Sequence, residues 1–396
     1  MFFSISKKAK QNYSDQHTLG QFTVSTDPGW QRALVGETVV LFKGYADYDS
    51  LTNILSEIVS SSVPTHTGNF CVLCLSDNVV TIKTDKYRSF PIYVSEGIEV
   101  TNLNRYEHIC WTDSVLSVDE NINVHYNRIN VIGDIDTTPI THSDGINIID
   151  KILTDKTKAF VAHNTLPIRA FMSGGVDSAL TYSYMARYAT DYTSVTYNHV
   201  EWDEFWMKNS GTLQQNWAYK QMHYWADDCI LTTGSPGDEF MLRSPRTVSM
   251  FLFSKGTSVP EINTDHSNLH YSYFTQEKHL KVFAEQEELN RQKFSKLSEK
   301  VRNRLICDDV LNDWQHWHLG RTLTWTPLRD IEITKTLLRM PYESILGQIL
   351  DSSISKELMN KQCPGISSAI SDQKNTGNAL KNLFQYYLSN RPSTSQ

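Results

Sequence analysis

The spacing of hydrophobic residues divides this chain of 396 residues into two parts. Between about residues 20 and 145, apolar residues form short runs separated by turn residues, a pattern typical of β-strands. One segment, 48–60, instead places its apolar residues at helical spacing. The first part therefore predicts a mostly antiparallel β domain with few helices, its expected strands being 21–24, 38–42, 70–75, 79–82 and 92–94.

From Ile146 onward the pattern changes to helices that alternate with short apolar strands and glycine turns. This alternation is typical of a parallel α/β sheet. The stretch 133–145 between the two parts is polar, contains a proline and two glycines, and shows no periodicity, which predicts a linker. We expect a first domain over residues 1–140, a second over 141–389, and a flexible tail over 390–396.

Composition narrows the class of protein. The 44 acidic and 37 basic residues give a net charge of −7, which argues against a generalised basic surface for nucleic acid. No apolar run approaches the ~18 residues needed to span a bilayer, and six cysteines are too few for a disulfide framework. Cys71 and Cys74 have C-x-x-C spacing, but their apolar surroundings favour a buried strand over a metal pair. These features predict a cytoplasmic protein.

The first motif with candidate chemistry follows the predicted strand 168–172. It is Ser173-Gly174-Gly175-Val176-Asp177-Ser178, and an amphipathic helix begins within it. Two adjacent glycines let the backbone approach a ligand closely, and the N–H groups at a helix start favour an anion such as phosphate. Asp177 would repel phosphate unless a divalent cation lay between them, so the motif predicts ATP together with Mg²⁺. An ordinary helix cap is the simpler alternative.

The second motif follows another predicted strand, 229–233. It is Gly234-Ser235-Pro236-Gly237-Asp238-Glu239. Because the carboxyl ends of parallel strands meet at one edge of a sheet, this turn is expected beside the first motif. Asp238 and Asp177 would then bind Mg²⁺ from two sides. The chain contains no G-x-x-x-x-G-K-S/T sequence, which excludes a Walker-type nucleotide site.

The sequence 173–178 resembles the PP-loop of enzymes that cleave ATP to pyrophosphate and leave AMP on a substrate. Segment 234–239 is similar to the second signature of the asparagine synthetase family within this superfamily. Segments 325–333 and 370–375 resemble the family's "PFLD" segment and its late lysine segment, in the same order along the chain. More loosely, residues 68–72 and 84–93 resemble its glutaminase domain.

This resemblance implies a C-terminal PP-loop domain of the adenine nucleotide alpha hydrolase-like type, with a parallel sheet and extra helices. It further implies a preceding α+β domain with an Ntn-hydrolase-like sandwich. The implied activity is an ATP-dependent ligase that adenylates a carboxylate, aspartate first, before an amine or ammonia attacks to form an amide. Asp330 is expected to fix a helix start. The implied residues are Ser173, Gly174, Gly175, Asp177, Ser178, Gly234 and Ser235 for ATP and pyrophosphate, Asp177 and Asp238 for the metal, and Asp238 and Lys374 for catalysis.

Two departures from the family pattern bear on the nitrogen donor. The chain begins Met1-Phe2-Phe3 and has no cysteine before Cys71, so we expect no glutaminase activity from the N-terminal domain. In the second motif, Ser235 stands where the family usually has glutamate, and Pro236 replaces the second glycine. The nucleophile therefore stays open between free ammonia and an amine of the same molecule, as in β-lactam synthetases and lasso-peptide cyclases.

Two other functions remain open from the sequence. A PP-loop enzyme could modify a nucleobase, although the basic patches or zinc-ligating cysteines expected for RNA are not visible. A non-catalytic scaffold is the third possibility, and the presence of Ser173, Asp177, Ser178 and Asp238 argues against it. The expected partners are a small carboxylate and an amine or ammonia, with no membrane, and the charge balance argues against nucleic acid. A homodimer or an ammonia-supplying protein partner also stays open.

Overall fold

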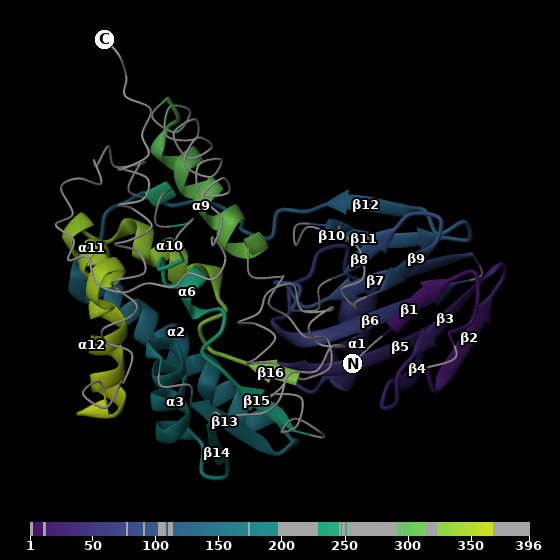
Figure 1. The fold of residues 1–396 in the computed structure, drawn as a ribbon, viewed down its shortest axis with the longest axis horizontal. Helices are drawn as coiled ribbons and strands as arrows, with labels where there is room; N and C mark the ends of the chain where they lie inside the picture. The colour runs from purple at the N-terminus through teal and green to yellow at the C-terminus, as the bar shows by residue number, and fades with distance from the viewer. Residues whose placement is uncertain are drawn as a thin grey trace, which may run out of the picture.

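Two antiparallel sheets and one parallel sheet form the framework of this mixed α/β protein (Figure 1). The antiparallel sheets belong to the first part of the chain and the parallel sheet to the second, as the sequence pattern predicts. The computed structural model describes residues 3–10, 13–76, 78–89, 92–101, 108–109, 114–172, 175–196, 229–244, 247, 250–251, 292, 294, 296–313 and 323–366.

The two antiparallel sheets have six strands each within the described residues. The first has the order β10 (His108–Ile109), β8 (Tyr93–Ser95), β9 (Glu99–Thr101), β1 (Phe3–Ser6), β3 (Phe22–Thr26), β2 (Asp15–Leu19). The second has the order β12 (Val124–Arg128), β11 (Ser114–Asp119), β7 (Val79–Thr84), β6 (Gly68–Ser76), β5 (Thr38–Ala46), β4 (Gln31–Val35).

The two sheets pack face to face around a shared apolar core. Phe3 and Phe22 from the first sheet meet Leu73 from the second sheet in this core. The other face of the second sheet is covered by α1 (Leu51–Ser60), which Ser50 caps by accepting a hydrogen bond from Asn53 N. Strand β6 is buried on both faces: Cys71 lies in the core between the sheets, and Cys74 packs on the α1 side. The two thiols therefore point to opposite faces and do not form a metal pair.

Helix α2 (His142–His163) opens the second part of the chain, and it begins earlier than the sequence pattern indicates. Thr141 caps it by accepting a hydrogen bond from Asp144 N at 3.1 Å. The helix therefore includes the end of the stretch 133–145 that was expected to be linker. The last polar residues of this stretch form the cap and the first turn of the helix. By composition alone, such residues cannot be told from a loop.

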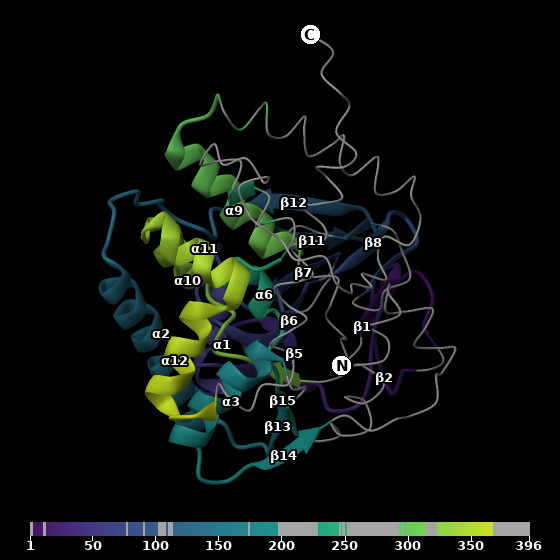
Figure 2. The same cartoon turned by 60° about the vertical axis from the view of Figure 1, so that its left-hand side comes forward.

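The parallel sheet has the order β14 (Thr193–Thr196), β13 (Ile168–Met172), β15 (Ile230–Thr232), β16 (Leu323–Trp325). Helices α2, α3 (Val176–Tyr188) and α12 (Ser353–Gln362) pack against one another beside this sheet (Figure 2). The remaining described helices are α6 (Gly237–Phe240), α9 (Glu299–Asp313), α10 (Ile331–Arg339) and α11 (Tyr342–Asp351). No helix within the described residues is long and apolar enough to cross a membrane.

Strand β16 of the parallel sheet contacts the second antiparallel sheet and helix α2. Tyr45 Oη donates a 2.6 Å hydrogen bond to Thr324 O, and Asn69 Nδ2 donates to the same oxygen at 3.1 Å. The Trp325 ring is buried and stacks on Phe160 of α2, with the ring centroids 4.2 Å apart. Strand β16 is therefore hydrogen-bonded to side chains of β5 and β6.

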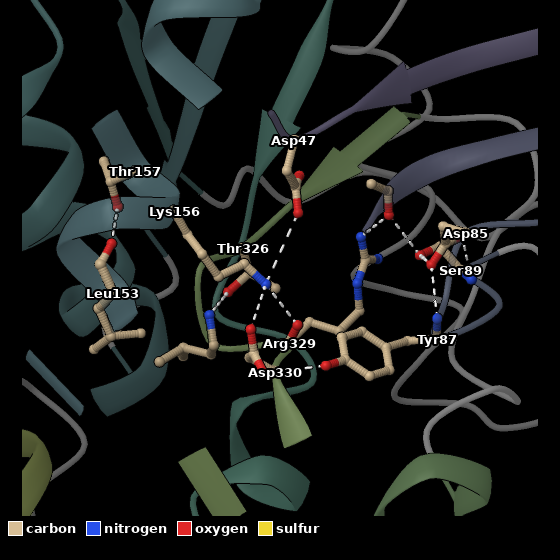
Figure 3. A network of polar contacts seen from close by, with 12 residues as sticks. Asp47, Asp85, Tyr87, Ser89, Leu153, Lys156, Thr157, Thr326, Arg329 and Asp330 are labelled. Carbon is tan, nitrogen blue, oxygen red and sulfur yellow. Dashed lines mark hydrogen bonds and ion pairs between the residues drawn. The ribbon is translucent and has the colours of Figure 1, made fainter. Parts of the chain in front are cut away.

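A buried polar network continues this contact (Figure 3). Lys156 is 1% exposed, and its Nζ donates to Arg329 O at 2.8 Å and lies 3.5 Å from Asp330 Oδ2 and 3.8 Å from Asp47 Oδ2. Asp330 also caps α10 by accepting from Glu332 N, which confirms the helix-start role expected for it. Asp47 from the first part of the chain and Lys156 and Asp330 from the second are thus paired inside this contact rather than exposed to water.

Candidate functional site

The first glycine motif lies between β13 and α3, the strand and helix that the sequence predicts around it. Gly175 occupies the N-cap position of α3 with extended backbone angles, and within the described residues no side chain caps this helix. Asp177 lies in the first turn, where a helix N-terminus favours negative charge. Ser178 is buried, and its Oγ donates a 2.9 Å hydrogen bond to Gly175 O. Ser173 and Gly174 lie outside the described residues.

The second glycine motif follows β15, and hydrogen bonds fix its conformation. Thr233 N donates to Trp325 O at 2.9 Å, which extends the pairing of β15 with β16 by one residue. Thr233 Oγ1 accepts a hydrogen bond from Ser235 N and donates one to Ser235 O, both at 3.1 Å. Ser235 and Asp238 are exposed, while Gly234 and Gly237 are buried. The turn therefore presents one hydroxyl and one carboxyl group to solvent.

The two motifs contact each other through glycines. A Cβ atom on Gly234 would lie 2.2 Å from Ser178 N and 2.3 Å from Asp177 C. A Cβ atom on Gly237 would lie 2.5 Å from Asp177 Cγ. Neither position has room for a side chain, so glycine is required here for close approach of the second loop to the first turn of α3. The loop after β15 is therefore packed directly on the first turn of α3, as the positions of the two motifs on one sheet edge predict.

Sheet order explains why these loops meet at this point. From β13 the chain goes to β14 on one side, and it then returns to place β15 on the other side of β13. In open α/β sheets, ligands bind at the carboxyl ends of the strands where the order reverses in this way. The first turns of α3 and α6, which carry Asp177 and Asp238, follow β13 and β15 at this reversal.

A buried arginine lies between the two carboxylates. Arg243 Nη2 donates to Asp177 Oδ2 and to Asp238 Oδ1, both at 2.6 Å. Its Nη1 donates to Ser352 Oγ at 2.6 Å, and its backbone N–H donates to Asp238 O at 2.6 Å. The Arg243 side chain is 2% exposed, whereas that of Asp238 is 52% exposed. One guanidinium group thus links both motifs to the start of α12.

Burial and charge act in opposite directions on this cluster. Burial raises the pKa of Asp177 to about 7, with Arg243 lowering it and the neighbouring Asp238 raising it further. For Arg243, burial lowers the pKa, but the attraction of Asp177 and Asp238 outweighs burial, and the net shift is upward. The arginine is therefore charged at any physiological pH, and Asp177 is the group whose protonation is sensitive to its surroundings.

The two carboxylates supply part of the ligand set that a divalent cation needs. Asp177 Oδ1 is buried and makes no hydrogen bond within the described part of the chain. Arg243 engages one oxygen of each carboxylate, which leaves the other oxygen of each for a ligand. No group of three or more His, Cys, Asp or Glu side chains forms a metal cluster in the described residues. Two carboxylates with substrate phosphates are the set that Mg²⁺ accepts.

The structure brings together the predicted site residues that it describes: Gly175, Asp177, Ser178, Gly234, Ser235 and Asp238. Lys374 and the expected tail 390–396 lie outside the described residues, as do Ser173 and Gly174. Sequence reasoning missed Arg243. The sequence does offer one signal for this arginine: it directly follows three apolar residues, 240–242, just after the second motif. The structure buries all three of them.

Comparisons with known proteins add little to this geometry. No family model matches the chain, and no curated protein matches it. Among solved structures, the chain is similar to a glutamine phosphoribosylpyrophosphate (PRPP) amidotransferase from B. subtilis, complexed with ADP and GMP, with a TM-score of 0.22 and 9% sequence identity. The match covers 58% of this chain and 63% of that chain. A score this low does not establish a shared fold, so the site rests on its own geometry.

Proposed function

We propose that this protein is an ATP-dependent, AMP-forming carbon–nitrogen ligase, with a PP-loop domain of the asparagine synthetase type behind an Ntn-hydrolase-like sandwich. The observation that carries the proposal is the contact of two glycine motifs at the reversal point of a parallel sheet, which places Asp177 beside Asp238. A helix N-terminus with an adjacent carboxylate pair suits a nucleotide polyphosphate that arrives with a divalent cation.

The proposed reaction has two steps. A substrate carboxylate oxygen attacks the α-phosphorus of ATP, and the bond to the β-phosphate oxygen breaks to release pyrophosphate. An amine or ammonia nitrogen then attacks the acyl carbon, the bond to the AMP oxygen breaks, and the nitrogen loses a proton. Mg²⁺ would neutralise the developing charge on the phosphates. Aspartate is the first candidate for the carboxylate.

The chain's own residues would bind and orient the nucleotide. Gly175 and the first turn of α3 would hold the pyrophosphate portion, with Ser173, Gly174, Ser178, Gly234 and Ser235 completing the cradle. Asp177 and Asp238 would each offer the oxygen that Arg243 does not engage to the cation. Lys374 would stabilise the leaving pyrophosphate through its positive charge.

The N-terminal sandwich would act as a docking domain in this scheme. The polar network that includes Lys156 and Asp47 fixes it against the segment after β16. Strand β16, which precedes this segment, pairs with the start of the second motif through the hydrogen bond from Thr233 N to Trp325 O. The sandwich would therefore support the proposed site through these contacts. The nitrogen donor would be free ammonia, an amine of the substrate, or ammonia from a partner protein.

Turnover products test the proposal directly. The full chain is incubated with ATP, Mg²⁺ and candidate carboxylates, aspartate first, with and without ammonium, and AMP and pyrophosphate are quantified. Asp177→Ala is expected to lower pyrophosphate release by 10²-fold or more, about the loss seen when a charged group at a reacting phosphate is removed. Glu332→Ala, an exposed acidic change at the start of α10, serves as the matched control.

Each other outcome of this experiment would point to a different function. ADP with inorganic phosphate would contradict a PP-loop enzyme. Consumption of ATP only with RNA or a free nucleobase would favour the nucleobase-modifying alternative. Absence of both ATP binding and turnover would favour the scaffold. Labelled ammonium that appears in the product would identify ammonia as the nucleophile.

A further inference from the structure

Arg243 lies between the two carboxylates that the proposed function assigns to a cation. Its Nη2 is 2.6 Å from an oxygen of each carboxylate, Asp177 and Asp238. With both carboxyl groups ionised, the three side chains carry a formal charge of −1 rather than −2. The site therefore already contains one positive charge, supplied by the chain itself.

This arginine is fixed in place. Ser352 Oγ accepts from Nη1, and Asp238 O accepts from the Arg243 backbone N–H. The residue before it, Leu242, and its partner Ser352 both adopt left-handed backbone angles, with φ values of 55° and 54°. Such angles are costly for residues other than glycine and persist where the surrounding structure requires them. The buried guanidinium is thus held by an arrangement that keeps it between the carboxylates.

The cluster nevertheless leaves polar atoms without partners. Asp177 Oδ1 and Arg243 Nε are both buried and make no hydrogen bond within the described residues. Buried polar groups in native proteins nearly always have a partner, so an unpaired carboxylate oxygen next to an exposed second carboxylate, Asp238, indicates a place for a ligand. When Asp177 is ionised its oxygens only accept, so the ligand has to be a donor or a cation.

We propose that Arg243 is the internal counter-ion of the Asp177–Asp238 pair and makes this pair accept a divalent cation only together with a polyphosphate. The inference rests on the proposed function and adds a condition to it. A guanidinium in contact with both carboxylates repels a free divalent cation. A pyrophosphate group brings negative charge and oxygen ligands that offset this repulsion, and Mg²⁺ is commonly bound by one or two carboxylates plus substrate phosphates. Arg243 is a positioning residue, because it acts through the two carboxylates.

Metal binding to the full chain without nucleotide tests this inference. Mn²⁺ replaces Mg²⁺ so that bound metal can be counted by electron paramagnetic resonance. Two neutral variants, Arg243→Met and Arg243→Gln, are expected to bind free Mn²⁺ about tenfold more tightly than the wild type, or better. Arg243→Lys keeps the charge and is expected to bind Mn²⁺ as weakly as the wild type. Arg339→Met, which removes an arginine paired with Asp136 at 3.0 Å, is the control for net charge.

Equal or weaker Mn²⁺ binding by a folded neutral variant would overturn the inference, with folding checked by circular dichroism. Tight binding by the lysine variant would also overturn it, because the effect would then come from geometry rather than charge. In equilibrium dialysis with Mn²⁺ and pyrophosphate together, the wild type is expected to retain both, and retention of neither would remove the site. The Mn²⁺ measurement requires no turnover. Failure to form AMP would thus contradict the proposed function and leave the counter-ion result standing.

Discussion

Tyr87 Oη donates a 3.0 Å hydrogen bond to Asp330 Oδ1 and so connects the N-terminal sandwich to the start of α10. Tyr87 is buried, and its ring packs edge-on against Phe240 of α6, two residues after Asp238. Burial raises the pKa of the Tyr87 hydroxyl well above its ordinary value. The contact between the two parts of the chain and the candidate site therefore share one packed region.

Tyr87→Phe tests this connection. The change keeps the ring and removes the hydroxyl, so Asp330 loses one donor while the packing on Phe240 is unchanged. We expect the free energy of unfolding to fall by about 1–2 kcal/mol, measured by urea denaturation. Tyr48→Phe is the matched control, because Tyr48 is 51% exposed and its change should be close to neutral. Equal stability of both variants would mean that the hydrogen bond between Tyr87 and Asp330 is not stabilising.

Lys156→Met tests the buried charges of the interface. The variant leaves Asp47, which is 2% exposed, and Asp330 without the ammonium group that lies near both. Removal of one partner from a buried ion pair costs about 3–5 kcal/mol, and we expect a loss of this size in urea denaturation. Lys151→Met on the same helix is the control, because Lys151 is 75% exposed and its pairing with Asp155 contributes little.

The double variant Lys156→Met with Asp47→Asn extends this test. Neutralising Asp47 removes the uncompensated charge, so the double variant is expected to regain part of the stability that Lys156→Met loses. A double variant less stable than the sum of the two single changes would show that the network depends on other members, such as Asp330.

Asp85 gives the interface a pH dependence. Burial raises the pKa of Asp85 to about 6, although Arg329 and the hydrogen bonds from Ser89 and Tyr87 lower it. A folded-state pKa above the unfolded value means that this group's contribution to stability is fully present below about pH 4 and is lost as pH rises through 6. Relative to Asp85→Asn, the wild type should therefore lose about 2–3 kcal/mol between pH 4 and pH 7.

The measurement is the free energy of unfolding of both proteins at several pH values, so that other titrating groups cancel in the difference. A difference that grows in favour of the wild type as pH rises would show that the pKa of Asp85 is lowered rather than raised. A difference independent of pH would show that its pKa is unchanged by folding.

Gly234→Ala tests the contact between the two glycine motifs. A methyl group here would lie 2.2 Å from Ser178 N, so the loops must move apart. We expect a loss of about 1–3 kcal/mol in stability, as for other overpacked sites, together with reduced release of AMP and pyrophosphate. Ser235→Ala is the control for stability, because Ser235 is the exposed neighbour of Gly234 in this turn. Its free energy of unfolding should equal that of the wild type. A Gly234→Ala protein with unchanged stability and turnover would contradict the close approach.

Local sequence patterns predicted the elements that position the site. Strands 70–75 and 79–82 are part of β6 and β7, helix 48–60 contains α1, and Ile168–Met172 is β13 as expected. These elements were predictable because short apolar runs and helical spacing depend only on neighbouring residues. The start of α2 was not, because the cap residue Thr141 lies within a polar stretch that resembles a loop.

The sequence alone determined that two glycine-rich turns follow two strands and that each carries an aspartate, because glycine and helix-start chemistry are local properties. The tertiary structure decided which groups meet there. Arg243 is separated from Asp177 by 66 positions and from Ser352 by 109, and its placement between them depends on how the sheet and helices pack. Lys156 likewise appears as one more helical lysine until the fold brings Asp47 and Asp330 to it. Long-range charge pairing follows from packing, which periodicity along the chain does not encode.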